Sequence, residues 1–147
     1  MPRRSIALAV LGAVALAAAG CGGSFKDDFK SLNDQILKLS PKVGDAIRAA
    51  PTKSDAEKKK EFGDLASKMG DLQSKAKDLD APDKLKAQKG RLVDAMGETK
   101  KALQDIADAA GAHSRRRATR AVRELVLGGV KLSQARRRLA RATGAKV

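Results

Sequence analysis

From Phe25 onward the apolar residues recur three or four positions apart, a spacing typical of amphipathic helices. Pro41 falls inside the first stripe without changing its phase. We therefore expect one kinked helix or two short helices end to end, because proline disrupts a helix interior. The segment 50–53 is the first clear break. The stripe consists of Phe25, Phe29, Leu32, Ile36, Leu39, Val43, Ile47 and Ala50.

A second helix is expected to begin at Ser54, because Ser54 and Glu57 have the spacing of a capping box. Gly63 and Gly70 lie within this helix. Each glycine either weakens the helix or marks a close contact with a neighbouring helix. The apolar stripe consists of Phe62, Leu65, Met69, Leu72, Ala76 and Leu79.

Two more helices follow. Pro82 is expected in the first turn of the third helix, where proline is tolerated, and Gly111 closes it. Ser114 is the expected cap of a fourth helix over about 114–143, in which Gly128 and Gly129 predict a weak point or kink. The third stripe is Leu85, Leu92, Met96, Leu103, Ile106 and Ala110, and the fourth is Val122, Leu125, Val126, Gly129, Leu132 and Leu139.

Long helices joined by short breaks favour antiparallel neighbours. No segment alternates apolar and polar residues with the period of a strand. The sequence therefore predicts an all-α fold, an up-and-down three- to four-helix bundle over residues 25–147. An elongated helical hairpin that completes its core by dimerising is the alternative.

Composition changes this picture in two ways. About 42% of the 147 residues are hydrophobic, but many of them are alanine, so the core of the single expected domain is thin. The chain has one Cys and one His, which excludes an internal disulfide and a zinc site with four such ligands.

Residues 1–20 have the pattern of an export signal. Arg3 and Arg4 precede an apolar run over 6–16, and small residues fill 17–20. The run is shorter than the ~20 residues that span a bilayer, so a cleaved signal fits better than an uncut membrane anchor. We expect the general secretory route, although the two arginines leave the twin-arginine route open.

The residues Ala18-Ala19-Gly20-Cys21 resemble the lipobox of bacterial lipoproteins, with Ala18 in place of the usual leucine. The resemblance implies cleavage between Gly20 and Cys21 and a diacylglyceryl group, with acyl chains such as palmitate, on the Cys21 sulfur. Two acyl chains give stable anchoring. Residues 21–24 would then be the lipidated cysteine and a flexible tether, on the extracytoplasmic face of the cell membrane.

A wider resemblance covers most of the chain. A Cys-anchored signal and two helices, followed by Leu79-Asp80-Ala81-Pro82 with Leu85 and Leu92, look like small helical lipoproteins of GC-rich Gram-positive bacteria. The resemblance implies an envelope lipoprotein and transfers no catalytic residue.

The net charge of +14 is unevenly distributed. Residues 21–110 contain 18 basic and 16 acidic side chains, whereas residues 111–147 contain 11 basic side chains and one acid, Glu124. Nine of those 11 are arginines. The fourth helix is therefore expected to be amphipathic and strongly basic.

A helical wheel gathers most of these charges on one side, which suits contact with an anionic lipid surface or an anionic wall polymer. A solvated face without a partner is the plainer interpretation. Nucleic acid fits poorly, because an export signal is present and the chain has no Tyr or Trp to stack on bases. The candidate contact residues are Arg116, Arg117, Arg120, Arg123, Lys131, Arg138 and Arg141.

Catalytic chemistry is sparse. His113 lies in the break between two helices, and Cys21 is the expected lipidation site, which leaves little for nucleophilic or general-base catalysis. The sequence thus predicts a non-enzymatic lipoprotein without metal or cofactor, apart from the lipid on Cys21, that binds or spaces something at the membrane surface. A carrier of a small apolar ligand, or an accessory subunit of an envelope complex, are the alternatives.

Overall fold

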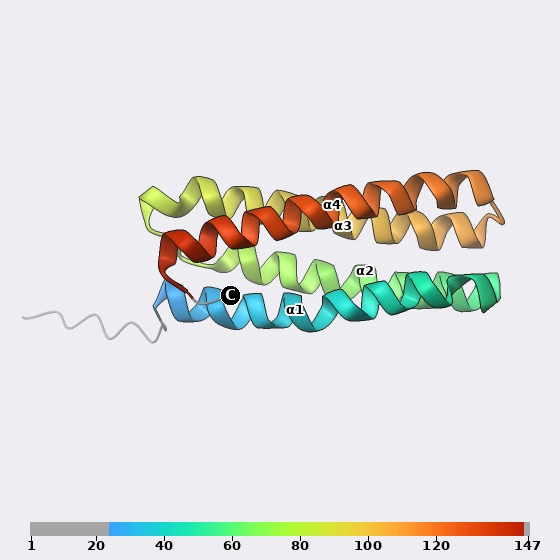
Figure 1. Cartoon of the computed structure of the whole chain (residues 1–147), viewed down its shortest axis with the longest axis horizontal. Helices are drawn as coiled ribbons and strands as arrows, with labels where there is room; N and C mark the ends of the chain where they lie inside the picture. The colour runs from blue at the N-terminus through green and yellow to red at the C-terminus, as the bar shows by residue number, and fades with distance from the viewer. Residues whose placement is uncertain (1–23, 146–147) are drawn as a thin grey trace, which may run out of the picture.

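A computed structural model describes residues 24–145. Within this range the chain forms four α-helices and one short 3-10 helix, and no strand (Figure 1). The all-α prediction is confirmed. The helices are α1 (Phe25–Ala49), α2 (Asp55–Asp78), α3 (Asp83–Gly111) and α4 (Arg115–Thr143), with the 3-10 helix η1 (Ala50–Thr52) after α1.

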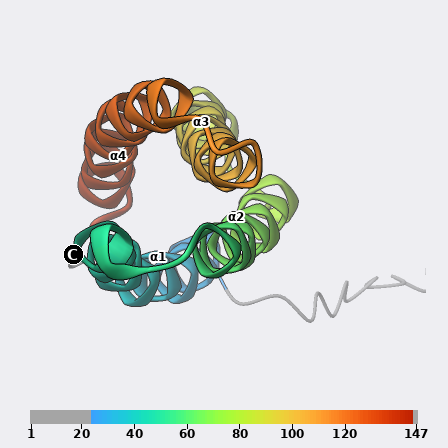
Figure 2. The same cartoon turned by 90° about the vertical axis from the view of Figure 1, so that its right-hand side faces the viewer.

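The helices run up and down as a four-helix bundle. Seen end-on they occupy four corners in chain order, so that α2 lies diagonally across from α4 (Figure 2). Contacts are most extensive between α2 and α3 and between α3 and α4, and α1 packs mainly on α2. Most residues of the four apolar stripes are thus buried or half-buried within one chain, as predicted for a bundle.

α1 is a single helix that continues through Pro41, so the prediction of two short helices is wrong. Proline removes only one backbone donor, and the chain keeps its helical path on both sides. Phe29, Ile36 and Leu39 from the predicted stripe are buried, which supplies the packing that offsets the lost hydrogen bond.

The predicted capping box at the start of α2 is present. The Glu57 N–H donates to the Ser54 hydroxyl at 3.3 Å, and the Ser54 N–H donates to Glu57 Oε2 at 2.8 Å. Hydrogen bonds from the Ser54 hydroxyl and then its backbone lower the pKa of Glu57. At the other end of α2, Lys89 Nζ donates to the carbonyl of Leu79 at 2.5 Å, which ties the α2–α3 turn to α3.

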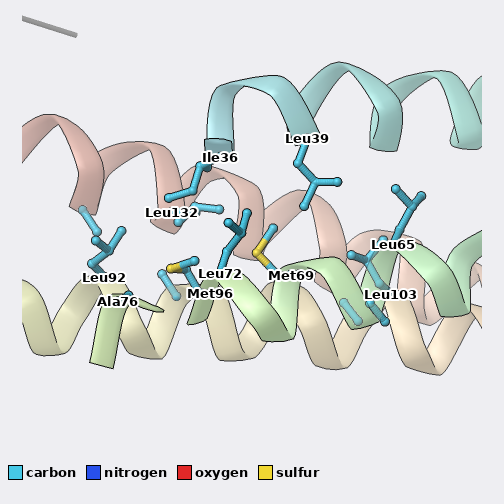
Figure 3. Close-up of a cluster of buried hydrophobic side chains, with 14 of the residues drawn as sticks. Ile36, Leu39, Leu65, Met69, Leu72, Ala76, Leu92, Met96, Leu103 and Leu132 are labelled. Carbon is cyan, nitrogen blue, oxygen red and sulfur yellow. The ribbon is translucent and has the colours of Figure 1, made fainter. Parts of the chain in front are cut away.

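The core consists of a few large side chains between many alanines. Leu92, Met96 and Leu103 of α3 are fully buried and meet side chains of α2 and α4 (Figure 3). Besides Leu85 and Ile106, the remaining buried residues of α3 are small, which lets its neighbours approach closely. The buried small residues of α3 are Ala95, Thr99, Ala102, Ala107, Ala109 and Ala110.

The Gly128–Gly129 pair does not break α4, which continues through both residues. Gly128 is buried, and a Cβ there would lie 3.1 Å from Thr99 Oγ1 and 3.4 Å from Thr99 backbone atoms. Gly129 is exposed, with nothing within 4 Å of an added Cβ. Gly128 is therefore the point of close approach between α3 and α4.

The glycines of α2 differ from this pair. An added Cβ at Gly63 meets nothing within 4 Å, and one at Gly70 meets only the flexible stem of Lys100 at 3.2 Å. Neither position marks a close backbone contact. They are consistent with the simpler expectation that glycine weakens a helix.

The end of α3 differs in detail from the prediction. Gly111 is the last helical residue, but the left-handed conformation is taken by His113, with φ of 50°. His113 lies in the turn before Ser114, at the end of the bundle that also holds the start of α2.

Replacing Ser54 with alanine should lower the free energy of unfolding by about 1 kcal/mol, because the cap loses its side-chain acceptor. Urea unfolding measures this. Ser67→Ala, at an exposed interior position of α2, is the control and should change stability much less.

The stabilisation by this cap should also depend on pH. Because the pKa of Glu57 is lowered in the folded state, the contribution of the cap to the free energy of unfolding is complete above the unfolded-state pKa of Glu57 and declines as the pH falls. An effect of Ser54→Ala that is equally large in strong acid would contradict this account.

Gly129→Ala should stabilise the protein by roughly 0.5–1 kcal/mol, since alanine is the better helix former and its Cβ meets open space. Gly128→Ala gives the same gain in helix propensity, but its Cβ would lie too close to Thr99, and this steric cost offsets the gain. Thermal unfolding should therefore rank Gly129→Ala clearly above Gly128→Ala. Equal stabilisation by the two variants would show that α3 and α4 separate easily at this point.

Candidate functional site

α4 holds every arginine of the basic C-terminal segment in fixed positions. The helix begins after Ser114, whose hydroxyl accepts from the Arg117 N–H at 3.5 Å. It ends at Gly144, which adopts the left-handed conformation at φ of 65°, where glycine carries no steric penalty. The arginines therefore point in directions that their places on one continuous helix determine.

The buried face of α4 differs from the predicted stripe. Val126 and Gly129 were expected on the apolar side, but Val126 is 58% exposed and Gly129 is exposed. At position 128, where α3 comes close, a glycine occupies the contact rather than a branched side chain. The buried residues are Ala121, Leu125, Gly128, Leu132, Ala135, Leu139 and Ala140.

Four of the seven predicted contact residues lie on the edge of α4 that borders α3. They line two open hollows together with acidic side chains of α3. One pair is direct, with Lys131 Nζ 2.7 Å from Glu98 Oε2. The acids of α3 therefore offset part of this charge at the surface of the bundle. The four basic residues are Arg117, Arg120, Lys131 and Arg138, and the α3 acids are Asp94, Glu98, Asp105 and Asp108.

The other three predicted residues, Arg116, Arg123 and Arg141, are exposed on the side of α4 away from α3. Arg137, which lay outside the predicted stripe, is exposed with them. Within residues 24–145 none of these four guanidinium groups makes an ion pair. Their charge is thus directed into solvent.

An apolar cluster lies between these arginines along the helix. Val126, Leu127 and Val130 are 58%, 63% and 51% exposed. Positions 123, 127, 130, 137 and 141 are separated by steps of three, four or seven, which places them on one side of the helix. We name this side the outer face of α4, and it consists of Arg116, Arg123, Val126, Leu127, Val130, Arg137 and Arg141.

Sequence reasoning missed the apolar centre of the outer face because it assigned Val126 to the core. The signal was present, since Leu127 and Val130 continue the spacing from Arg123. The buried side of α4 is marked by Leu125, Leu132 and Leu139 with small residues between them at spacings of three and four, and Val126 does not fall on this pattern.

Arg136, unlike the arginines of the outer face, is partly buried and connects α4 to another helix. Its Nε donates to Asn33 Oδ1 at 2.7 Å, and Asn33 is 1% exposed on α1. Burial, and then the neighbouring charge of Arg137, lower the pKa of Arg136. This hydrogen bond joins α4 to α1 across the side of the bundle where contacts are fewest.

The C-terminal end of α4 lies at the same end of the bundle as the start of α1 (Figure 1). Ser24, the first residue described, caps α1 there through its hydroxyl, which accepts from the Asp27 N–H at 3.4 Å. The predicted cleavage and lipidation residues, Gly20 and Cys21, lie outside the described residues.

Groups with other chemistry lie on the surface. His113 Nδ1 is 2.6 Å from Asp55 Oδ2, and hydrogen bonds from Lys58 and then His113 lower the pKa of Asp55.

In the described segment no cluster of three or more His, Cys, Asp or Glu side chains has the arrangement of a metal site. Nor does any helix of residues 24–145 combine the length and apolarity needed to cross a bilayer.

The hollow between α1 and α2 is open and lined mostly by charged side chains, including Lys42, Glu61 and Lys68. This lining does not resemble the apolar pocket that a carrier of a small apolar ligand requires.

Comparison with protein-family models, with curated proteins and with solved structures finds no match to this chain.

Arg136→Ala should lower the free energy of unfolding by about 1.5–3 kcal/mol, because a charge-assisted hydrogen bond to buried Asn33 is lost. Arg137→Ala, one residue along and exposed, is the matched control and should stay within about 0.5 kcal/mol of the parent. Urea unfolding of both variants measures the difference. Equal losses would show that the Asn33 hydrogen bond contributes nothing specific.

Proposed function

We propose that this protein is a lipid-anchored, non-enzymatic envelope protein that holds a helical bundle against the extracytoplasmic face of the cell membrane. In this role α4 contacts an anionic surface. The observation that carries the proposal is the row of exposed arginines on the outer face of α4, whose charge no acid of residues 24–145 pairs. Arginine suits such a surface because its planar guanidinium binds phosphate oxygens in pairs.

The sequence before the bundle supports the location. The lipobox-like residues end at Cys21, and α1 begins at Phe25. A chain of four residues reaches at most ~14 Å when fully extended. A lipid on Cys21 would therefore keep the start of α1 close to the membrane, together with the C-terminal end of α4, which carries Arg137 and Arg141 and lies at the same end of the bundle (Figure 1).

The two attachments differ in physical character. A diacylglyceryl group provides two acyl chains and stable anchoring, independent of salt. Each Lys or Arg near an anionic leaflet adds about 1 kcal/mol, and salt screens this attraction. The lipid would set where the protein is, and the arginines would set how the bundle lies there.

A non-enzymatic role agrees with the placement of the reactive side chains. His113 is exposed in a turn, where its Nδ1 lies 2.6 Å from Asp55 Oδ2. Cys21 has the position of a lipidation site. The role of accessory subunit remains a second candidate, because Val126, Leu127 and Val130 form an exposed apolar cluster that a protein partner could cover.

Replacing Cys21 with serine should release the protein from salt-washed membranes, because serine cannot take the thioether-linked diacylglyceryl group. Membrane fractionation of cells expressing the full chain measures this, and labelling with an alkyne fatty acid should mark the parent and not the variant. Ser24→Ala, which keeps Cys21, is the control and should fractionate as the parent does. Retention of Cys21→Ser in the salt-washed membranes would overturn the anchor.

A further inference from the structure

We infer that the outer face of α4 binds an anionic lipid bilayer by inserting its apolar centre among the lipids while its arginines contact headgroup phosphates. The inference rests on the proposed function and deepens it, because it names the bilayer itself as the partner of α4. It also fixes the pose, with the bundle lying lengthwise on the membrane and α4 underneath.

The first step is the concentration of exposed apolar side chains. A single exposed aliphatic residue is ordinary on a soluble surface. Here, however, three of the four large hydrophobic residues that are exposed in the described structure fall within five positions of α4. They are Val126, Leu127 and Val130, and each is more than half exposed. The cluster therefore has the geometry of a short apolar wedge.

The second step is the position of the charges. Arg116 and Arg123 precede the cluster on the outer face, and Arg137 and Arg141 follow it. A helix of 29 residues is about 43 Å long, so the arginines bracket the wedge along most of the bundle. Interfacial amphipathic helices combine these features, with basic residues at headgroup level and aliphatic residues below it.

The third step compares the possible occupants. A polyanionic polymer would satisfy the arginines but would leave the wedge in contact with polar groups. A second copy of this chain docked through α4 would bring two arginine rows together, and like charges repel. An anionic bilayer meets both requirements at once, because it has phosphates at its surface and hydrocarbon directly beneath.

The fourth step is the direction of α4 from the tether. Its C-terminal end lies at the tethered end of the bundle, and α1 and α4 occupy neighbouring corners (Figures 1 and 2). A tether of at most ~14 Å at that end allows the outer face to lie along the membrane surface. The lipid and the wedge can therefore act on the same bilayer.

A tryptophan reporter tests insertion, since the chain contains no tryptophan of its own. All core residues of the described structure lie between Phe29 and Ala140, so residues 24–147 without lipid contain the complete bundle. Leu127→Trp in this segment should show a blue-shifted emission with vesicles of equal parts phosphatidylglycerol and phosphatidylcholine, and no shift with phosphatidylcholine alone. Ser67→Trp, exposed on α2 at the diagonal corner, is the control and should not shift.

Two sets of substitutions separate the wedge from the charges. Replacing Val126, Leu127 and Val130 together with serine should weaken vesicle binding at least about tenfold, or about 1.4 kcal/mol. Replacing Arg123, Arg137 and Arg141 with glutamine should weaken it similarly and reduce its salt dependence. Replacing Lys131 and Arg138, which border the acids of α3, should have a smaller effect. Circular dichroism confirms that each variant is helical.

Three results would overturn the inference. They are an unshifted Leu127→Trp spectrum on bound vesicles, unchanged binding by the serine variant, or equally tight binding of the parent to inorganic polyphosphate. The last would indicate a polymer site. These outcomes are independent of the anchor, because the segment carries no lipid. Loss of membrane retention in Cys21→Ser cells, with no insertion in vesicles, would leave the lipoprotein assignment standing and remove only the bilayer contact.

Discussion

The close approach of α3 to both α2 and α4 is the constraint on which the rest of this bundle depends. With few large apolar residues available, the chain gains packing by bringing backbones together, and small side chains at the contacts make this possible. Among the glycines of the described residues, Gly128 is the one whose added Cβ would meet the backbone of another helix, at 3.4 Å from Thr99. Once α4 is seated there, its rotation is fixed, and the same rotation turns Leu127 and Val130 into solvent. The exposed wedge is therefore a direct consequence of how the core is packed.

Much of the fold could be predicted from the sequence, because periodicity and capping are local. The stripe of α1 and the Ser54–Glu57 capping box are present as expected. The errors came where the answer depended on a neighbour. Val126 is more hydrophobic than Gly128, so a wheel drawn for α4 alone turns Val126 inward. In the structure Gly128 takes the inward place against Thr99 of α3, and no local pattern connects positions 99 and 128.

The candidate site could likewise be predicted in part from the sequence. The abundance of arginine in the last helix is a property of composition, so it can be counted directly in the sequence. Its division into two groups is a property of the bundle. Lys131 meets Glu98 of α3, whereas Arg123 meets solvent, although both belong to the same predicted stripe. A wheel describes one helix in isolation, and the acids that balance its charge belong to another helix.

The even number of helices has a consequence of its own. Each helix reverses the direction of the chain, so four of them return it to the end where it began. The start of α1 and the end of α4 consequently lie at one end of the bundle, with the α2–α3 turn, while η1 and the α3–α4 turn lie at the other (Figure 1). With three helices of similar length, a tether at the N-terminus would hold the last residues of the chain some 40 Å away. The even number of helices thus brings the start of α1 and the end of the basic helix α4 to the same end of the bundle.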